Sequence, residues 1–63
     1  MPLIDVTPPR LVEVCVAGSW HSGELRAWRR SEGRWRGFVC YVVGVGARHL
    51  AWVDQDQLRP VEA

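Results

Sequence analysis

Arginine and tryptophan side chains gather in the middle of the chain. Residues 26–36 contain five arginines and one glutamate, a net charge of +4 within a chain whose formal net charge is +1. The guanidinium group is planar and permanently charged, so it suits phosphates and aromatic faces. A tryptophan ring can stack on a nucleobase, and such a contact contributes roughly 1–3 kcal/mol. The segment therefore predicts a nucleic-acid-binding surface. Its expected contacts are Arg26, Trp28, Arg29, Arg30, Arg34 and Arg36, with Trp20 as a second stacking group.

The same arginines also have a simpler interpretation as the solvent-facing side of a strand. Glu24 and Glu32 lie close enough in the sequence to form ion pairs with some of them. Outside this segment the chain has three arginines and six acidic residues. The whole chain is therefore far less basic than most duplex-binding domains, which argues against strong non-specific binding to duplexes.

No catalytic arrangement is evident in the sequence. Nucleophilic catalysis needs a base beside a serine or cysteine, and a third group that orients the base. The candidate groups are His21, His49, Ser19, Ser22, Cys15 and Cys40, and their spacing matches no catalytic motif. The chain also lacks a Cys-x-x-Cys pair and a glycine-rich phosphate loop before a helix. We therefore expect no enzyme activity, no metal and no cofactor.

The composition indicates one small globular domain. The chain has 63 residues, of which 48% are hydrophobic, and a domain of this size buries only about 60% of its unfolded surface. No apolar run approaches the roughly 18 residues of a membrane span, and the first residues lack the pattern of a secretory signal. We expect a cytoplasmic protein without membrane contact. Cys15 and Cys40 are expected to be free thiols, although a disulfide stays open at this stage.

Short β-strands separated by turn residues account for most of the chain. The expected strands span residues 11–17, 23–30, 34–43, 48–54 and 58–61, with one helical turn over 54–57. Three prolines make residues 1–10 an extended arm. A helix over 22–31 is the main alternative, because Glu, Leu, Arg and Ala favour helices, but the flanking strands need a sheet partner. We predict an all-β, five-stranded barrel over residues 11–63 that follows an N-terminal arm over residues 1–10.

Alternation along the strands predicts which side chains share a face. In the second strand, Leu25 and Ala27 are expected on one face and Trp28 on the other, among arginines and exposed to solvent. In so small a barrel two of the four tryptophans are expected in the core, and we assign these positions to Trp35 and Trp52.

A spaced set of glycine and aromatic residues resembles Tudor domains and related Src-homology-3-like barrels. The set comprises Gly18-x-Trp20-x-x-Gly23-x-Leu25, then Val39-x-Tyr41, Trp52-Val53 and a closing Leu58-Arg59-Pro60. The resemblance covers residues 11–61 and implies a five-stranded barrel. Tudor domains bind methylated lysine or arginine in an aromatic cage, whereas related barrels bind nucleic acid or proline-rich peptides. By this resemblance, Trp20 and Tyr41 occupy positions of cage aromatics.

The apolar run over residues 42–47 supports an alternative function. It contains three valines, two glycines and an alanine at the expected tip of a hairpin. Exposed apolar surface of this kind often binds another protein. The alternative is therefore a protein-interaction module that uses Trp20, Tyr41 and the 42–47 tip, with a partner protein or with a second copy of the chain as a homodimer.

Overall fold

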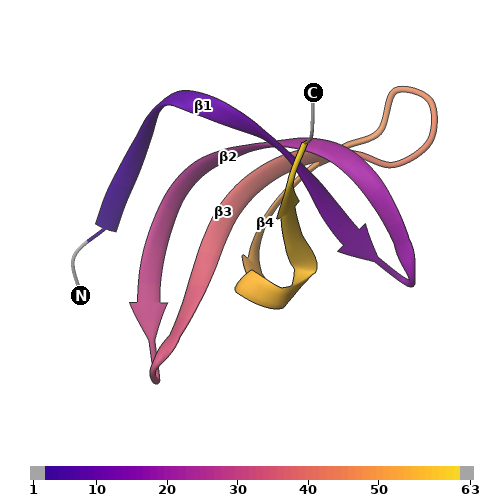
Figure 1. Cartoon of the computed structure of the whole chain (residues 1–63). Helices are drawn as coiled ribbons and strands as arrows, with labels where there is room; N and C mark the ends of the chain where they lie inside the picture. The colour runs from indigo at the N-terminus through magenta and orange to yellow at the C-terminus, as the bar shows by residue number, and fades with distance from the viewer. Residues whose placement is uncertain (1–2, 62–63) are drawn as a thin grey trace.

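The computed structural model describes residues 3–61, which form a single antiparallel sheet of five strands in the order β4-β3-β2-β1-β5. The elements are β1 (Leu3–Val16), β2 (Ser19–Ser31), β3 (Arg34–Val42), β4 (Arg48–Asp54), a 3₁₀ turn η1 (Gln55–Gln57) and β5 (Leu58–Pro60). The strands curl into a half-barrel that does not close, because β4 and β5 form the two borders of the sheet (Figure 1). The prediction of five strands in an all-β fold is confirmed.

Two short turns fold the first three strands back on one another. Ala17-Gly18 connects β1 to β2, and Glu32-Gly33 connects β2 to β3. All four residues have positive φ, with values of 50°, 83°, 53° and 77° in chain order. Positive φ at both central residues matches the twist of antiparallel strands, and glycine adopts it without steric cost. The predicted turn at Gly33 is confirmed, whereas β2 begins at Ser19, four residues earlier than the sequence indicated.

An irregularity in β2 decides which of its side chains face the interior. Leu25 pairs with Val39, but Ala27 pairs with Phe38, so Arg26 is an extra residue in β2. An extra residue shifts the alternation of the strand by one position. Trp28 therefore packs against the core cluster on the same side as Leu25, and Ala27 lies on the convex side. The prediction that Leu25 and Ala27 share a face, opposite an exposed Trp28, was wrong for this reason.

The core on the concave side of the sheet is small and aliphatic. It consists of Val12, Val14, Leu25, Val39 and Val53. Val14 and Val39 are fully buried. The prediction that Trp35 and Trp52 belong to this core was wrong, since both rings are half-buried and lie outside the cluster.

The N-terminal residues belong to the sheet. Leu3, Ile4 and Asp5 pair with β2, and regular pairing resumes at Arg10 after an interruption. A separate extended arm over residues 1–10 is therefore not confirmed, because the described part of it is the first half of β1. Met1 and Pro2 lie outside the described residues. The alternative of a helix over residues 22–31 is excluded by the pairing of β2 with β1 and β3.

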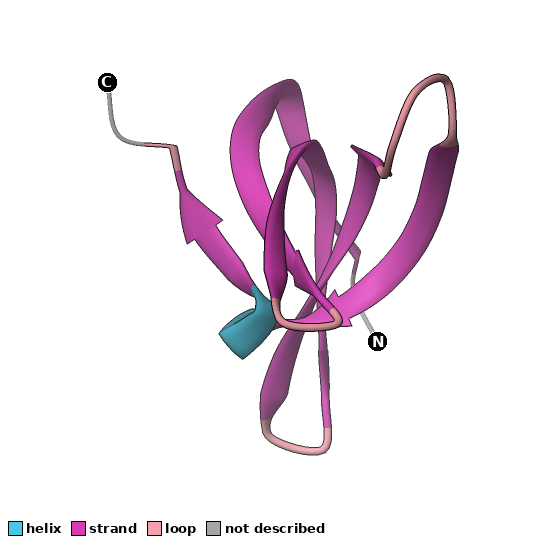
Figure 2. Cartoon of the chain, turned by 90° about the vertical axis from the view of Figure 1, so that its right-hand side faces the viewer, coloured by secondary structure: helices cyan, strands magenta, loops and turns pink. Residues whose placement is uncertain are grey.

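The C-terminal part of the chain returns to β1 through η1. The Asp54 side chain accepts a hydrogen bond from the Asp56 amide, and the Gln57 side chain accepts one from the Asp54 amide. These two bonds together cap the N-terminus of the helical turn. The predicted turn over residues 54–57 is thus confirmed. β5 then pairs with β1, with Leu58 opposite Val14. Figure 2 shows η1 in cyan leading into this last strand. Within residues 3–61 no helix has the length and apolar character needed to span a membrane.

Candidate functional site

The main feature of the concave side is a pair of tryptophans beside an open hollow. The Trp28 and Trp35 rings meet edge to face, with centroids 6.3 Å apart and planes at 82°. They line a hollow of about 400 Å³ together with Ile4 and Gln55. Trp28 reaches this side because of the irregularity at Arg26. The two rings offer aromatic surface to a flat partner, as edge-to-face pairs leave parts of both faces accessible.

A second hollow continues from the first along the open side of the half-barrel. It has a volume of about 450 Å³ and shares Trp28 and Gln55 with the first. It extends past Leu58 to two cations, Arg10 and Arg59. The two hollows together form a groove with an aromatic end and a cationic end, which we call the concave groove. A groove of this composition suits a ligand with flat rings and negative charge.

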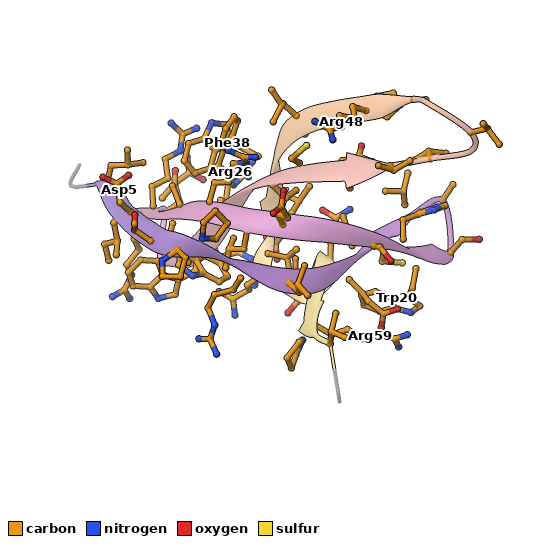
Figure 3. The ribbon with its side chains drawn as sticks, turned by 90° about the horizontal axis from the view of Figure 1, so that it is seen from above. Asp5, Trp20, Arg26, Phe38, Arg48 and Arg59 are labelled. Atoms are coloured by element: carbon orange, nitrogen blue, oxygen red, sulfur yellow. The ribbon has the colours of Figure 1, made fainter. Side chains whose placement is uncertain are left out.

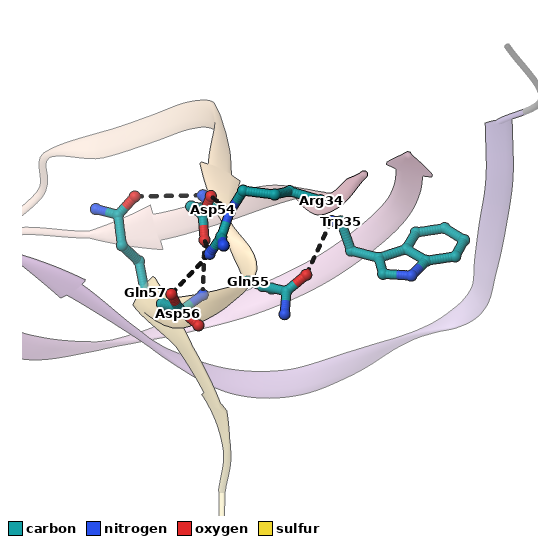
Figure 4. A network of polar contacts seen from close by, with 6 residues as sticks. All are labelled: Arg34, Trp35, Asp54, Gln55, Asp56 and Gln57. Atoms are coloured by element: carbon teal, nitrogen blue, oxygen red, sulfur yellow. Dashed lines mark hydrogen bonds and ion pairs between the residues drawn. The ribbon is translucent and has the colours of Figure 1, made fainter. Parts of the chain in front are cut away.

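Hydrogen bonds from η1 hold the aromatic end in place. The Trp35 amide donates to Gln55 Oε1 at 2.9 Å, as Figure 4 shows. Gln57 Nε2 donates to the carbonyl of Cys15 at 3.2 Å, which ties η1 to β1 as well. The groove is lined by segments that are far apart in the sequence, since Ile4 and Gln55 line the same hollow.

Arg30 is the arginine that pairs directly with one of the two tryptophans, Trp35, in the β2–β3 ladder. Its side chain is exposed. Within residues 3–61 it forms no ion pair. The guanidinium of Arg30 is therefore available to an anionic ligand beside the aromatic end of the groove.

Two further arginines lie opposite each other on the convex side of the same hairpin. Arg29 pairs with Arg36 in the ladder, and like charges in this position repel. The Arg29 guanidinium sits 4.3 Å from the centroid of the Trp52 ring, a cation–π contact. The β2–β3 hairpin projects beyond the rest of the sheet (Figure 1), so it carries positive charge on both faces. An anion near the hairpin would relieve the repulsion.

Arg34 has a different environment from the other predicted contacts. Its Nε and one Nη donate to both oxygens of Asp54 at 2.8 and 2.6 Å, and the same Nη reaches Asp56 at 2.6 Å (Figure 4). The hydrogen bond from Arg34 is the largest cause that holds the pKa of Asp54 well below its usual range. The same bonds raise the pKa of Arg34. Arg34 therefore links β3 to η1 and has its charge compensated.

Arg26, the extra residue of β2, lies near an acidic neighbour. Its guanidinium is 3.4 Å from Glu24, and both side chains are about half exposed. Exposed pairs of this length contribute little stability. Arg26 can therefore exchange Glu24 for another anion more easily than Arg34 can exchange its two aspartates.

The structure does not bring Trp20 and Tyr41 together. Tyr41 pairs with Gly23 in the ladder, so alternation along β2 places Trp20 on the opposite face. Trp20 lies under Arg59, whose guanidinium is 4.0 Å from the ring centroid, near the Arg59–Glu13 ion pair (Figure 3). Tyr41 stacks on His49, with ring centroids 5.4 Å apart. Each aromatic thus has a partner of its own in place of a shared cage.

Sequence reasoning missed several groups that line the concave groove. Trp35 was assigned to the core because so small a barrel was expected to bury two of its four tryptophans, but the sheet is open at that end. Its position as the second residue after a two-residue turn was the signal that it lies at the rim. Ile4, Arg10 and Gln55 come from segments that carry no motif, so no local signal could have found them.

No group of three or more potential metal ligands occurs within the described residues. Cys15 is half-buried and Cys40 is buried, and both are free thiols. No known protein family matches the chain, and neither a curated protein nor a solved structure matches it. The function has therefore to be inferred from the geometry of the site.

Proposed function

We propose that this chain is a non-catalytic module that binds single-stranded nucleic acid through the concave groove and the β2–β3 hairpin. The observation that carries the proposal is the Trp28–Trp35 pair, which lines an open hollow beside Arg30. We further propose that the half-barrel belongs with the Src-homology-3-like and Tudor-like barrels. The five strands and the curl of the sheet are compatible with that kinship.

The aromatic end of the groove supplies the stacking surface. Proteins that bind single strands combine aromatic rings, on which bases stack, with a positively charged path for the backbone. The hollow between Ile4 and the two tryptophans is open to solvent on one side, so a base can enter without a change in the sheet. Bases inside a duplex already stack on each other, and their faces are not accessible to these rings. The aromatic geometry therefore favours single strands.

The cations around the hairpin supply the charge. Arg30 lies beside the tryptophans, whereas Arg29 and Arg36 lie on the convex face of the same narrow hairpin. Charges on both faces act on a nucleic-acid strand bound at this end of the sheet, because the screening length at physiological salt is about 8 Å. Arg34 is left out of the proposed contacts, since a phosphate would have to replace two carboxylates. The predicted contacts that remain are Arg26, Trp28, Arg29, Arg30 and Arg36, and Trp35 joins them.

The proposal is tested by the fluorescence anisotropy of a labelled oligothymidylate, with a duplex of the same length for comparison. We expect single strands to bind more tightly than duplexes. The slope of log K against log salt should lie between about −0.7 and −3, because one to four arginines contact phosphates and each contributes about −0.7 for a single strand. Affinity without salt dependence, or no binding to single strands at low salt, would contradict the proposal.

Two matched pairs of variants locate the contact. Trp35→Ala should weaken single-strand binding about fivefold or more, the loss expected for one stacked base. Trp20→Ala is the comparison. Trp20 lines neither hollow and contacts Arg59 at the far, cationic end of the groove, so its loss should weaken binding less. Arg30→Gln should reduce the salt slope, whereas Arg48→Gln, at the start of β4, should leave it unchanged. Equal effects of the two tryptophan variants would rule out the concave groove as the site.

A protein partner at the hairpin tip is a second candidate function. The tip over residues 42–47 is closed by a hydrogen bond from the Val43 amide to the Ala47 carbonyl. Val45 at its end is fully exposed, with a relative accessibility of 106%. If the tip is the functional surface, Val45→Asp should abolish association with the partner while Trp35→Ala leaves it intact. The opposite pattern would reject the tip.

A further inference from the structure

β4 is an unprotected edge of the sheet. It has seven residues and pairs with β3 alone among the strands, and Figure 3 shows it at one border of the ribbon. Natural edge strands are commonly protected by charged side chains, proline, a bulge or a covering segment. β4 contains neither proline nor lysine, its charged residues Arg48 and Asp54 lie at its two ends, and its register with β3 is regular from Arg48 to Asp54. Leu50 in its centre is 63% exposed.

The hydrogen bonds at the end of β4 show which amides point outward. The Asp54 amide donates to the Gln57 side chain, so it does not point toward β3. Backbone groups in an antiparallel strand alternate between its two sides. The amides and carbonyls of Leu50 and Trp52 therefore point to the free side of β4, together with those of Arg48. Within residues 3–61, the backbone hydrogen bonds other than those of the regular strand pairs do not involve these outward groups of β4.

The side chains of β4 are complementary to those of a second copy of β4 that runs antiparallel to it. When two copies run antiparallel with Ala51 opposite Ala51, Leu50 faces the partner's Trp52 and Arg48 faces the partner's Asp54. All four side chains lie on the convex face, as Leu50 pairs with Cys40 and Trp52 with Phe38 in the ladder. Opposite charges directly across an antiparallel pair attract each other, and Asp54 already has Arg34 and Arg36 beside it within its own chain. If the register between the two β4 strands shifts by one residue in either direction, these pairs do not form.

We propose that two copies of this chain associate through their β4 strands, antiparallel and with Ala51 opposite Ala51. Leu50 and Trp52 exchange backbone hydrogen bonds with the partner's Trp52 and Leu50, and the two half-barrels form one continuous sheet. The pairing uses the same surface of both copies and closes on itself, as in most homodimers. The inference goes beyond the proposed function, because Trp28 and Trp35 take no part in it.

The other border of the sheet explains why association ends at the dimer. β5 has only three residues, and one of them is Pro60. A short edge with a proline is a poor template for another strand. Once two β4 strands have paired, the remaining borders of the dimer are β5 and the part of β1 that β5 does not cover, which contains Pro8 and Pro9.

Sedimentation equilibrium and amide hydrogen exchange test the proposal on the wild-type chain. We expect a monomer–dimer equilibrium without larger species. The amides of Leu50 and Trp52 should gain protection as the protein concentration rises. The amides of His49 and Ala51, which point toward β3, should be protected at every concentration. A chain that stays monomeric at millimolar concentration, or outward amides whose protection ignores concentration, would overturn the proposal.

Variants with a matched control separate the β4 edge from other apolar surfaces. Leu50→Lys should raise the dissociation constant at least about tenfold, because it removes an apolar cross-strand pair twice in the dimer. Leu11→Lys is the control. It has the same substitution and a similar exposure of 68%, and it lies on the same row of the convex face, but β1 has strand neighbours on both sides. A dimer that is disrupted by Leu11→Lys and not by Leu50→Lys associates through another surface.

Two further substitutions check the register of the dimer, and circular dichroism checks that each variant is folded. Arg48→Glu should weaken the dimer, and the effect should shrink as salt rises, because the substitution places two acidic groups together at both ends. Val45→Asp should leave the dimer intact, which distinguishes the edge from the hairpin tip. Circular dichroism of each variant verifies that it is folded, and the hydrogen-exchange result on the wild type stands even if a variant is not. Strong weakening by Val45→Asp with a folded chain would count against the β4 register.

Discussion

Gly37 is a position where the packing of the half-barrel is sensitive to a small change. It lies on the concave side of β3, between Trp35 and Val39. A methyl group added there would be 2.7 Å from Leu25 Cδ1 and 2.7 Å from Leu58 Cδ1, well inside the 3.4–4 Å of ordinary contact. The same methyl would be 3.4 Å from Trp28 Cζ3. Gly37→Ala therefore strains the contact between β2, β3 and β5.

The expected cost follows from two opposing effects. Overpacking of a core typically costs about 1–3 kcal/mol. Both clashing atoms are the ends of leucine side chains, but Leu25 is buried and has little room to turn away, which places this site in the upper part of that range. Alanine in a strand regains about 0.5–1 kcal/mol relative to glycine. We therefore expect Gly37→Ala to lower the free energy of unfolding by about 1–2.5 kcal/mol. This is a large part of the roughly 3–9 kcal/mol available to a 63-residue chain, and it lowers Tm by about 4–20 °C.

Urea unfolding followed by tryptophan fluorescence measures this loss. A double-mutant cycle with Leu58→Ala tests its cause, because a shorter side chain at position 58 leaves room for the new methyl. The double variant should be more stable than the sum of the single losses predicts, by about 1 kcal/mol. If Gly37→Ala is as stable as the wild type, or if the two losses simply add, then Leu58 does not pack over Gly37 and the account of β5 docking is wrong.

Three other predictions concern the remaining parts of the molecule. Since Arg34 lowers the pKa of Asp54 in the folded chain, the stabilisation is present above the unfolded pKa of about 3.9 and is lost as pH falls further. The wild type should therefore lose more of its urea midpoint between about pH 5 and pH 2.5 than Arg34→Gln, and equal losses would refute the link. Val14→Ala should cost about 2 kcal/mol or more in a urea melt because Val14 is fully buried, whereas Val45→Ala should stay within about 0.5 kcal/mol. A thiol-specific reagent should label half-buried Cys15 before buried Cys40 in the folded chain, and simultaneous labelling would show that β3 opens as easily as β1.

Much of the fold could be predicted from local patterns. Local patterns identified the five strands and the turn at Gly33, although β1 and β2 begin earlier than expected, and Asp54 with Gln57 identified the helical turn. Within β3 and β4 the side chains alternate regularly between the two faces, since neither strand contains an irregularity in the ladder they share. These features depend on a few neighbouring residues, so they can be predicted from the sequence alone.

The candidate site was predicted less well, because its geometry depends on segments that are far apart. The extra residue at Arg26 shifts Trp28 from the convex to the concave side, and nothing in the local pattern marks a bulge there. Arg34 was grouped with the free cations because its aspartate partners lie 20 and 22 residues later.

The sequence by itself determined the strands, the turns and the concentration of arginine near tryptophan. Only the tertiary structure decided which of those groups meet. It set Trp28 against Trp35, placed Trp20 and Tyr41 on opposite faces, and left β4 without a strand partner on one side. The physical reason is that strand formation follows from local side-chain preferences, whereas register, curl and closure follow from hydrogen bonds and packing across the whole sheet.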